Sequence, residues 1–142
     1  MARARDLISE EYISVTADAT VDEAIDAVRK YTPGAAVTIY YVYVTDADGK
    51  LTGIASLREL LNAAGDVAVT DVMTDEVDEV SASATSEDVA EAFVEHGYPA
   101  LPVRDDDGTL LGIVRSADVI DALDERTAKD LLSDVKGFQP FG

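Results

Sequence analysis

The sequence contains no cysteine and a single histidine among its 142 residues. The absence of cysteine excludes disulfide bonds, thiolate metal sites and a cysteine nucleophile. No apolar run approaches the roughly 20 residues that a membrane-spanning helix needs. The opening stretch MARARDLISE also lacks the apolar core of a secretory signal. We therefore expect a soluble, cytoplasmic protein without direct membrane insertion.

Groups that catalyse reactions are equally scarce. His96 is the only histidine, and its position just before GYPALPV favours a loop or the end of a helix. Ser81, Ser83, Ser86 and Ser116 have no base near them in the sequence. Nothing in the pattern separates two carboxylates into an acid and a base of different pKa. We expect no catalytic residues, no enzymatic activity and no required cofactor.

Basic residues are also few, because 11 lysines and arginines stand against 29 aspartates and glutamates, for a net charge of -18. Such a surface repels the phosphates of DNA and RNA, so we expect no nucleic acid partner. Two explanations for the acidity remain open. One is adaptation of a halophilic acidic protein to a salty cytoplasm, where the screening length falls to about 3 Å near 1 M salt. The other is sensing of a divalent cation, because Mg²⁺ and Ca²⁺ prefer carboxylate oxygens.

The sequence does contain an internal duplication. Residues 4–28 align with residues 69–93 without a gap, and residues 40–60 align with residues 99–119 with both glycines in register. The identical pairs of the first block include Asp6/Asp71, Val15/Val80, Ala19/Ala84, Thr20/Thr85 and Ala27/Ala92. A self-match of this length indicates duplication of one supersecondary unit. We expect a first repeat, a second repeat and a C-terminal tail or linker, at residues 1–64, 65–128 and 129–142.

The pattern of each repeat predicts the order β-α-β-β-α. Thr20 and Thr85 are each followed three residues later by an acid, which indicates a helix start. Two β-rich runs around Asp-x-Asp-Gly then predict a hairpin, and second helices are expected at about 57–64 and 116–126. The DADG and DDDG segments are too short for a calcium loop of about twelve residues, so their Asp and Gly are interpreted as turn residues. The sequence therefore predicts an α+β fold.

The segment YPALPVRDDDGTLLGIVRSADVIDAL resembles the signature of CBS (cystathionine-β-synthase) domains, and the pattern occurs twice across residues 6–126. The resemblance implies a CBS pair, or Bateman module, with two repeats packed pseudo-symmetrically through their sheets, clefts between them, and a homodimer. The segments IYYVYVTDADGKLTGIASLRELL, VTDVMTDEV and VIDALDERTAKDLL are similar to the cytosolic CBS pair of MgtE-type magnesium transporters. That similarity implies a membrane transporter domain in the same or a neighbouring chain, with the pair at the inner face of the membrane.

In CBS domains the pattern Gly–apolar–apolar–Ser/Thr–x–x–Asp/Asn is a nucleotide signature, whose hydroxyl faces phosphate and whose acid binds ribose hydroxyls. A strand that ends at a helix N-terminus also offers free N–H groups to an anion. The second repeat keeps the acid but has arginine in place of the hydroxyl, which either grips phosphate or points to solvent. The first repeat keeps the hydroxyl, has Glu in place of Asp, and has a neighbouring arginine that would compensate.

The resulting candidates for an adenine nucleotide such as ATP or AMP share these two motifs. In the second repeat they are Tyr98, Pro99, Ala100, Arg115, Ser116 and Asp118, and in the first repeat they are Ser56, Arg58 and Glu59. The alternative, in which these residues only pack and cap helices, remains open.

A cluster of acids follows the second motif and is the candidate for binding Mg²⁺. Its members are Asp118, Asp121, Asp124, Glu125 and Asp130. Spacings of three and four residues place Asp118, Asp121 and Glu125 on one helix face, where a divalent ion or a cationic partner would relieve their repulsion. The MgtE resemblance implies that such acids lie near the pore, where bound Mg²⁺ holds the closed form, although Arg126 and Lys129 depart from that acidity. A solvated acidic face is the alternative, here and at the cluster Asp75, Glu76, Asp78 and Glu79.

Together these patterns predict a non-catalytic regulatory module that senses Mg²⁺, and possibly also an adenine nucleotide, for a magnesium transport system. Neutralising the acidic faces would draw the two repeats together, a population shift driven by differential affinity. The alternative is a sensor of AMP, ATP or S-adenosylmethionine that regulates an unrelated enzyme or transporter. A purely structural dimerisation module is a third interpretation, and it predicts no response to any ligand.

Overall fold

The computed structural model describes residues 3–31 and 41–122, with the side chains of 120–122 excepted. The chain divides into two compact units. Unit 1 consists of Met1–Ser9, Glu79–Asp106 and Leu111–Gly142, and unit 2 consists of Glu10–Asp78 and Asp107–Leu110. Unit 1 thus holds most of the second sequence repeat, and unit 2 holds most of the first. The predicted borders of the sequence repeats, after residues 64 and 128, stay a prediction. The compact units are defined by contacts in space and divide the chain at other positions.

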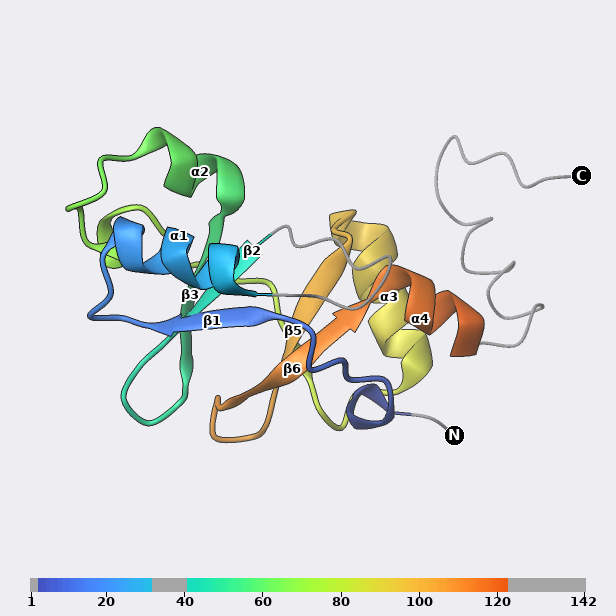
Figure 1. Ribbon diagram of the computed structural model, residues 1–142. Helices are drawn as coiled ribbons and strands as arrows, with labels where there is room; N and C mark the ends of the chain where they lie inside the picture. The colour runs from blue at the N-terminus through green and yellow to red at the C-terminus, as the bar shows by residue number, and fades with distance from the viewer. Residues whose placement is uncertain (1–2, 32–40, 123–142) are drawn as a thin grey trace, which may run out of the picture. The chain divides into compact units, whose positions relative to one another are not determined.

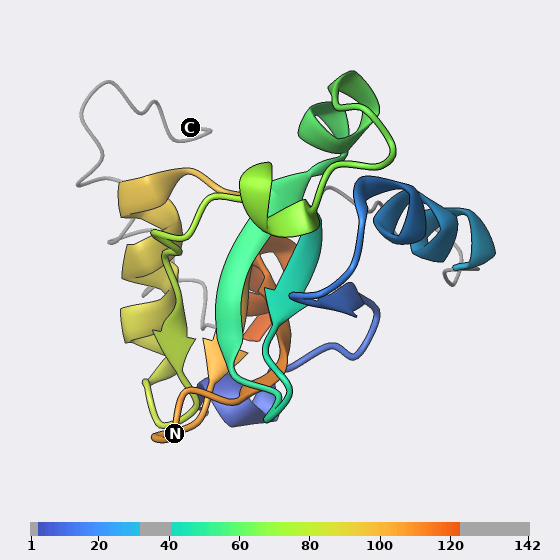
Figure 2. The ribbon, with the colours of Figure 1, turned by 90° about the vertical axis from the view of Figure 1, so that its left-hand side faces the viewer.

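Unit 2 is built on a three-stranded sheet with the order β1-β2-β3 (Figure 1). Its strands are β1 Ile13–Thr16, β2 Tyr41–Thr45 and β3 Leu51–Ser56, and its helices are α1 Val21–Lys30, α2 Leu57–Asn62 and a short 3-10 helix, Val69–Asp71. Strand β1 runs parallel to β2, with Ile13 opposite Val42, and β3 runs antiparallel to β2, with Ala55 opposite Val42. Figure 2 shows both α1 and α2 on one side of β2 and β3.

Unit 1 repeats this plan. Its strands are β4 Val80–Ser81, β5 Ala100–Arg104 and β6 Leu110–Arg115, and its helices are α3 Ser86–His96, α4 Ser116–Ala122 and a 3-10 helix, Ala4–Asp6. The sheet order is β4-β5-β6, with β4 parallel to β5 and Val80 opposite Val103. Helices α3 and α4 pack against each other (Figure 1). The α+β class and the β-α-β-β-α order of each repeat are confirmed.

The predicted helix starts at Thr20 and Thr85 are confirmed, and both are capping boxes. The Thr20 hydroxyl accepts from the Glu23 backbone N–H at 3.2 Å, and the Glu23 carboxylate accepts from the Thr20 N–H at 3.1 Å. The Asp88 N–H donates to the Thr85 hydroxyl at 3.1 Å in the same way. Each box satisfies backbone donors that the first turn of a helix leaves without intrahelical partners. His96 is the last residue of α3, as its position in the sequence predicts.

One helix end differs from the sequence-based expectation. Helix α2 ends at Asn62, two residues before the predicted limit, and Ala63 already has extended backbone angles of φ -94° and ψ 155°. The Asp22 N–H donates to the Gly65 carbonyl at 3.0 Å, so the chain after α2 is bound to the first turn of α1. That tertiary contact draws the backbone away from the helix axis.

The Asp-Gly segments of both hairpins form turns, which confirms their interpretation as turn residues. Gly49 and Gly108 have φ of +85° and +90°, a region that favours glycine. The Asp46 carboxylate accepts from the N–H groups of Asp48 and Lys50 at 2.9 and 3.0 Å, which holds the first turn closed.

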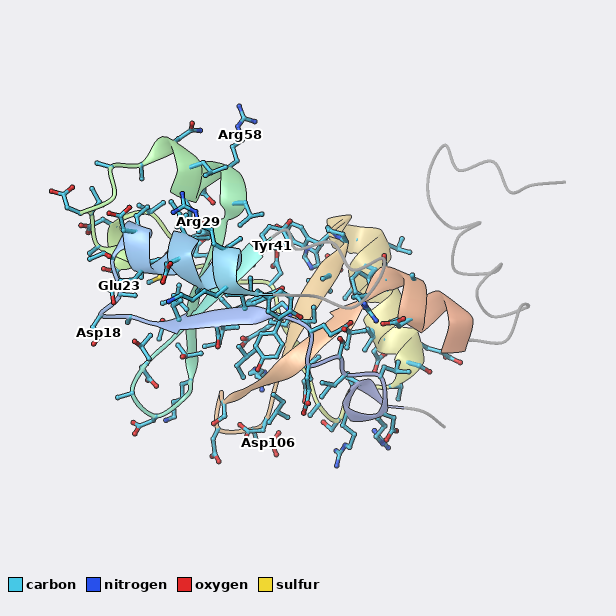
Figure 3. All side chains as sticks on the ribbon, viewed as in Figure 1. Asp18, Glu23, Arg29, Tyr41, Arg58 and Asp106 are labelled. Atoms are coloured by element: carbon cyan, nitrogen blue, oxygen red, sulfur yellow. The ribbon has the colours of Figure 1, made fainter. Side chains whose placement is uncertain are left out.

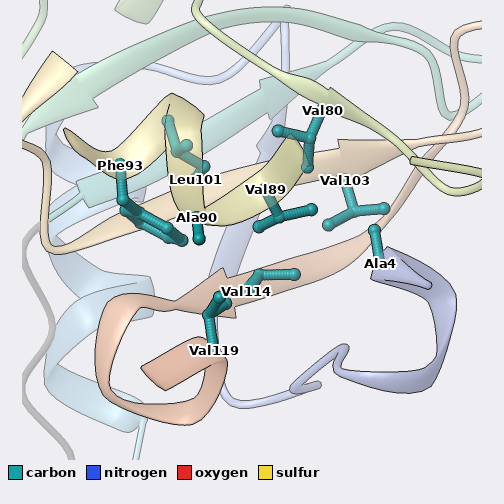
Figure 4. Packing of buried hydrophobic residues seen from close by; sticks show 9 residues of the cluster. All are labelled: Ala4, Val80, Val89, Ala90, Phe93, Leu101, Val103, Val114 and Val119. Atoms are coloured by element: carbon teal, nitrogen blue, oxygen red, sulfur yellow. The ribbon is translucent and has the colours of Figure 1, made fainter. Parts of the chain in front are cut away.

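Each unit has its own hydrophobic core on the helix-covered face of its sheet. Alternation along β2 directs Val42 and Val44 toward the helices and Tyr43 to the opposite face. The core of unit 2 contains Ile13, Ala19, Val21, Ala24, Val42, Val44, Ala55, Leu60 and Val69. The core of unit 1 contains Ala4, Val80, Val89, Ala90, Phe93, Leu101, Val103, Val114 and Val119 (Figure 4). Within the described part of the chain, no helix has both the length and the apolar character needed to cross a lipid bilayer.

Candidate functional site

The second-repeat motif lies where β6 passes directly into α4. Arg115 is the last residue of β6 and Ser116 is the first residue of α4. The Ser116 N–H donates to the Pro99 carbonyl at 3.1 Å, which ties the start of α4 to the residue that precedes β5. The structure thus brings together Pro99, Arg115, Ser116 and Asp118, four of the predicted nucleotide contacts. Ala100 begins β5 beside them.

The two charged residues of this motif are partners of each other. Arg115 Nε donates to Asp118 Oδ2 at 2.9 Å, and the two side chains are 34% and 36% exposed. An ion pair that solvent reaches to this extent contributes only about 0–1 kcal/mol to stability. A ligand with its own anion and hydroxyl groups can therefore replace this pair at small cost, with arginine turning to the anion and aspartate to the hydroxyls.

Tyr98 presents an exposed aromatic ring and directly precedes Pro99 in the sequence. Its side chain is 40% exposed, and its ring stacks on that of His96 with centroids 6.1 Å apart and planes inclined by 15°. Gly97, between them, has the left-handed φ of +72° and ends α3. This reversal of the backbone direction is what brings two rings that are two residues apart onto the same side. The contact between His96 and Tyr98 was not predicted from the sequence.

The first-repeat motif has a different local structure, because its hydroxyl and acid cap their own helix. The Glu59 N–H donates to Ser56 Oγ at 3.1 Å, and the Ser56 N–H donates to a Glu59 carboxylate oxygen at 3.0 Å. Ser56 and Glu59 therefore already satisfy donors at the start of α2. Arg58 is exposed and extends away from α2 (Figure 3). A ligand contact at these three residues stays a prediction.

The glycine that opens each motif has a packing role. A Cβ atom on Gly112 would lie 2.8 Å from the Ser9 carbonyl oxygen and would also collide with Ile8. A Cβ atom on Gly53 would collide with the Met73 side chain. Sequence reasoning assigned both glycines to the nucleotide signature and missed these contacts. The one sequence feature that points to these packing contacts is the duplication, because it relates Gly53 to Gly112 and Met73 to Ile8.

The predicted Mg²⁺ cluster extends beyond the part of the chain that the structure describes. Asp118 lies in α4 and pairs with Arg115, and Asp121 lies in the same helix, its side chain not described. The other three predicted ligands, Asp124, Glu125 and Asp130, fall outside the described residues. Among residues 3–31 and 41–122 no three potential metal ligands are grouped closely enough to hold an ion. In the second acidic cluster, Glu79 pairs with Arg104 Nε at 2.8 Å.

Tyr43 is a polar group that sequence reasoning did not single out. Its side chain is 2% exposed, and its buried hydroxyl has no hydrogen-bond partner among the residues that the structure describes. Burial raises the pKa of the Tyr43 phenol well above its ordinary value of 10.0, and the nearby Tyr41 raises it further. The Tyr12 ring meets Tyr43 edge-on, with centroids 6.0 Å apart. The spacing of Tyr41 and Tyr43 could have indicated that the two side chains lie near each other, since residues two apart in a strand share a face.

Comparison with known proteins places both repeats in one family. The model of the CBS domain matches residues 4–66 and again residues 69–125. Magnesium transporter MgtE of Thermus thermophilus is 37% identical over 125 residues, which cover 88% of this chain and 28% of that protein. MgtE of Enterococcus faecalis is 38% identical over 124 residues, covering 87% of this chain and 27% of that protein. The chain therefore spans about a quarter of the length of these curated relatives.

Solved structures agree with this assignment. The cytosolic domain of the Mg²⁺ channel MgtE in complex with ATP matches with a TM-score of 0.78 and 38% identity, over 85% of this chain and 48% of that one. CBSX2 in complex with AMP matches with a TM-score of 0.69 and 26% identity, over 86% of this chain and 96% of that one. The predicted resemblance to MgtE-type CBS pairs is confirmed. The chain belongs to the CBS domain family and contains two copies of that domain in tandem.

Proposed function

We propose that this chain is a non-catalytic regulatory module of a magnesium transport system, and that it responds to an adenine nucleotide and to Mg²⁺. The observation that carries the proposal is the Arg115–Asp118 pair at the junction of β6 and α4. It provides one group complementary to phosphate and one complementary to a cis-diol, both partly exposed. The similarity to an MgtE cytosolic domain in complex with ATP supports the same ligand class.

Binding of the nucleotide exchanges one ion pair for two ligand contacts. The Arg115 guanidinium turns from Asp118 to the phosphates, which accept its planar fork of donors. The freed Asp118 carboxylate accepts from the ribose hydroxyls, and the exposed Tyr98 ring offers a flat apolar face to the base. Because the chain carries a net charge of -18, the polyphosphate binds best together with Mg²⁺ or at high salt.

Mg²⁺ acts through neutralisation of acids. Asp118 and Asp121 of α4, with Asp124, Glu125 and Asp130 farther along the chain, repel one another when no cation is present. A divalent ion favours whichever conformation brings the carboxylates together, and it shifts the population by its differential affinity for that conformation. The readout is a change in conformation, with no bond made or broken in a substrate.

The partners follow from the same proposal. The module serves a membrane transporter domain in the same or a neighbouring chain, at the cytoplasmic face of the membrane. It acts as a homodimer, and it binds neither DNA nor RNA because of its negative charge.

Calorimetric titration with ATP and AMP, with and without Mg²⁺, tests the nucleotide part. Asp118→Ala is expected to weaken binding at least about tenfold, because it removes the carboxylate that accepts from the ribose hydroxyls. The matched control is Asp106→Ala, which removes the same carboxylate from the exposed tip of the second hairpin (Figure 3). Equal affinities of the two variants would exclude the ribose contact. A wild-type chain that binds neither nucleotide under any of these conditions would contradict the proposed function.

A second candidate is an adenosine-ligand sensor that regulates an unrelated enzyme or transporter. The similarity to CBSX2 in complex with AMP favours it. This alternative requires nucleotide affinity without a divalent ion and no response to Mg²⁺ alone. Small-angle scattering during a Mg²⁺ titration without nucleotide separates the two candidates, because only the first predicts a change in the scattering curve.

A further inference from the structure

The segment that leads each sequence repeat is bound by the unit that holds the other repeat. The N-terminal lead segment, residues 4–9, lies in unit 1 with the second repeat. The Ala4 N–H donates to the Ala84 carbonyl at 2.8 Å, and the Arg5 N–H donates to the Ala82 carbonyl at 3.1 Å. Ser9 and Ile113 exchange two backbone hydrogen bonds of 2.7 and 3.1 Å. This segment is thereby attached both to the loop before α3 and to β6.

The internal lead segment, residues 69–74, lies in unit 2 with the first repeat. Thr74 and Ile54 exchange two backbone hydrogen bonds of 2.8 and 3.0 Å, as Ser9 and Ile113 do in unit 1. The Val69 N–H also donates to the Ala19 carbonyl at 2.9 Å. Since positions 9 and 74 are equivalent in the duplication, as are positions 54 and 113, the two lead segments are bound in the same way.

Burial shows that these attachments are part of each core. Ala4 is 0% exposed within the core of unit 1, and Val69 is 0% exposed within the core of unit 2. The glycine beside each backbone pairing leaves room for the lead segment: Gly112 for Ile8 and Ser9, and Gly53 for Met73. At Gly112 the obstacle to a side chain includes the Ser9 carbonyl. A backbone atom cannot turn aside as the flexible Met73 side chain can.

We infer that the two lead segments are exchanged straps, meaning that each one begins one sequence repeat but packs in the unit that holds the other repeat. The residues that unfold or move together are therefore those of one compact unit, and not those of one sequence repeat. A displacement of residues 4–9 acts on unit 1. It reaches β6 through Ser9 and Ile113, two residues before Arg115. This last consequence rests on the proposed function, and it makes residues 4–9 a regulatory strap on the Arg115–Asp118 motif.

Hydrogen exchange of the full chain without nucleotide tests the exchange of straps. In Ala4→Asp, a charge enters the core of unit 1, and we expect exchange at least about tenfold faster in α3, β5 and β6, with α1, β2 and β3 unchanged. In the matched variant Val69→Asp we expect the reverse pattern. Loosening of the first repeat by Ala4→Asp, or equal loosening of both units by either variant, would overturn the inference.

A milder pair keeps the test decisive if the aspartate variants do not fold. Gly112→Ala is expected to speed exchange at the Ser9 amide and Gly53→Ala at the Thr74 amide, each without effect on the other site. The larger change is expected for Gly112→Ala, because Ser9 meets the new methyl group with its backbone. Unchanged exchange at Ser9 in Gly112→Ala would overturn the inference.

Titration of the same variants with ATP and Mg²⁺ tests the regulatory consequence. Ala4→Asp is expected to weaken ATP binding at least about threefold more than Val69→Asp does. Equal affinities of the two variants would overturn the link between residues 4–9 and the motif. Failure of the wild-type chain to bind ATP would instead contradict the proposed function, and the exchange pattern alone would still decide whether the straps are exchanged.

Discussion

The ring and the hydroxyl of Tyr43 contribute to folding stability with opposite signs. The side chain is 2% exposed and packs edge-on with Tyr12, so the ring contributes apolar burial and an aromatic contact. Within the described ranges its hydroxyl has no hydrogen-bond partner, and a buried polar group left in that state typically costs about 1–3 kcal/mol. The residue therefore stabilises unit 2 through its ring and opposes stability through its oxygen.

The substitution Tyr43→Phe separates these two contributions. It keeps the ring and removes the unpartnered hydroxyl, so we expect stability to be unchanged or to rise by up to about 1 kcal/mol. Urea unfolding of both proteins, followed by circular dichroism, measures the difference. A loss of more than about 1 kcal/mol would show that the hydroxyl has a partner in solution, such as an ordered water.

The same residue predicts sensitivity to alkaline pH. Burial raises the pKa of Tyr43 in the folded state above its ordinary value of 10.0, and burial also raises the pKa of Tyr12. Above that ordinary value the unfolded chain loses the phenol proton while the folded chain keeps it. The stability due to Tyr43 is therefore present below this pH and falls as pH rises, by about 1.4 kcal/mol per pH unit.

Urea midpoints measured across the alkaline range test this pH dependence. We expect the decline in stability to be shallower in Tyr43→Phe than in the wild-type protein. Parallel declines in both proteins would show that Tyr43 ionises equally easily in the folded and unfolded states.

At the scale of elements, helix starts distinguish the two repeats. Helices α1, α2 and α3 each begin with a capping box, at Thr20, Ser56 and Thr85. At the start of α4 the equivalent positions hold Arg115 and Asp118, which form an ion pair. A capping box fixes both side chains on the backbone, whereas the partly exposed ion pair joins the two side chains to each other. The divergence of one copy at this position therefore changes a helix cap into a candidate ligand site.

Removal of a cap measures how much one helix start contributes. Thr20→Ala is expected to destabilise the protein by about 1 kcal/mol, because it leaves the Glu23 N–H without its acceptor. Thr20→Ser, which keeps the hydroxyl, is the control and is expected to lose only a few tenths of a kcal/mol. Thermal unfolding compares the three proteins, and an equal loss in both variants would contradict the capping role.

At the scale of the whole molecule, the excess of negative charge is the feature that most affects how stability depends on salt. The chain has 29 acidic and 11 basic residues, so most carboxylates have no cation to pair with. Repulsion among surface charges destabilises the compact state, and dissolved salt screens it. Both adaptation to salt and binding of Mg²⁺ predict that the protein becomes more stable as salt is added. They differ in whether the identity of the cation matters.

Thermal unfolding in NaCl and in MgCl₂ at equal ionic strength separates screening from binding. We expect Tm to rise with either salt and to rise more with MgCl₂, because a divalent ion held between carboxylates stabilises the folded state beyond screening. Equal rises at every ionic strength would leave screening as the whole effect and would contradict Mg²⁺ binding.

Local features of this fold were predictable from the sequence. Hydrophobic spacing and the Thr-x-x-acid pattern predict α1 and α3 with their first residues, and Asp-x-Asp-Gly predicts both hairpin turns. The duplication predicts that each half has the same order of elements. These features depend on contacts between residues a few positions apart, for which the identities of neighbouring side chains are sufficient information.

The candidate site and the composition of the units were decided only by the tertiary structure. The sequence alone determined which residues are candidates for the two nucleotide motifs, but not that Ser56 and Glu59 cap a helix while Arg115 pairs with Asp118. It also gave no sign that residues 4–9 join the unit of the second repeat. These outcomes depend on packing between segments far apart in the chain, where a buried Ala4, a missing Cβ at Gly112 and two backbone hydrogen bonds at Ser9 act together. No local pattern records such contacts.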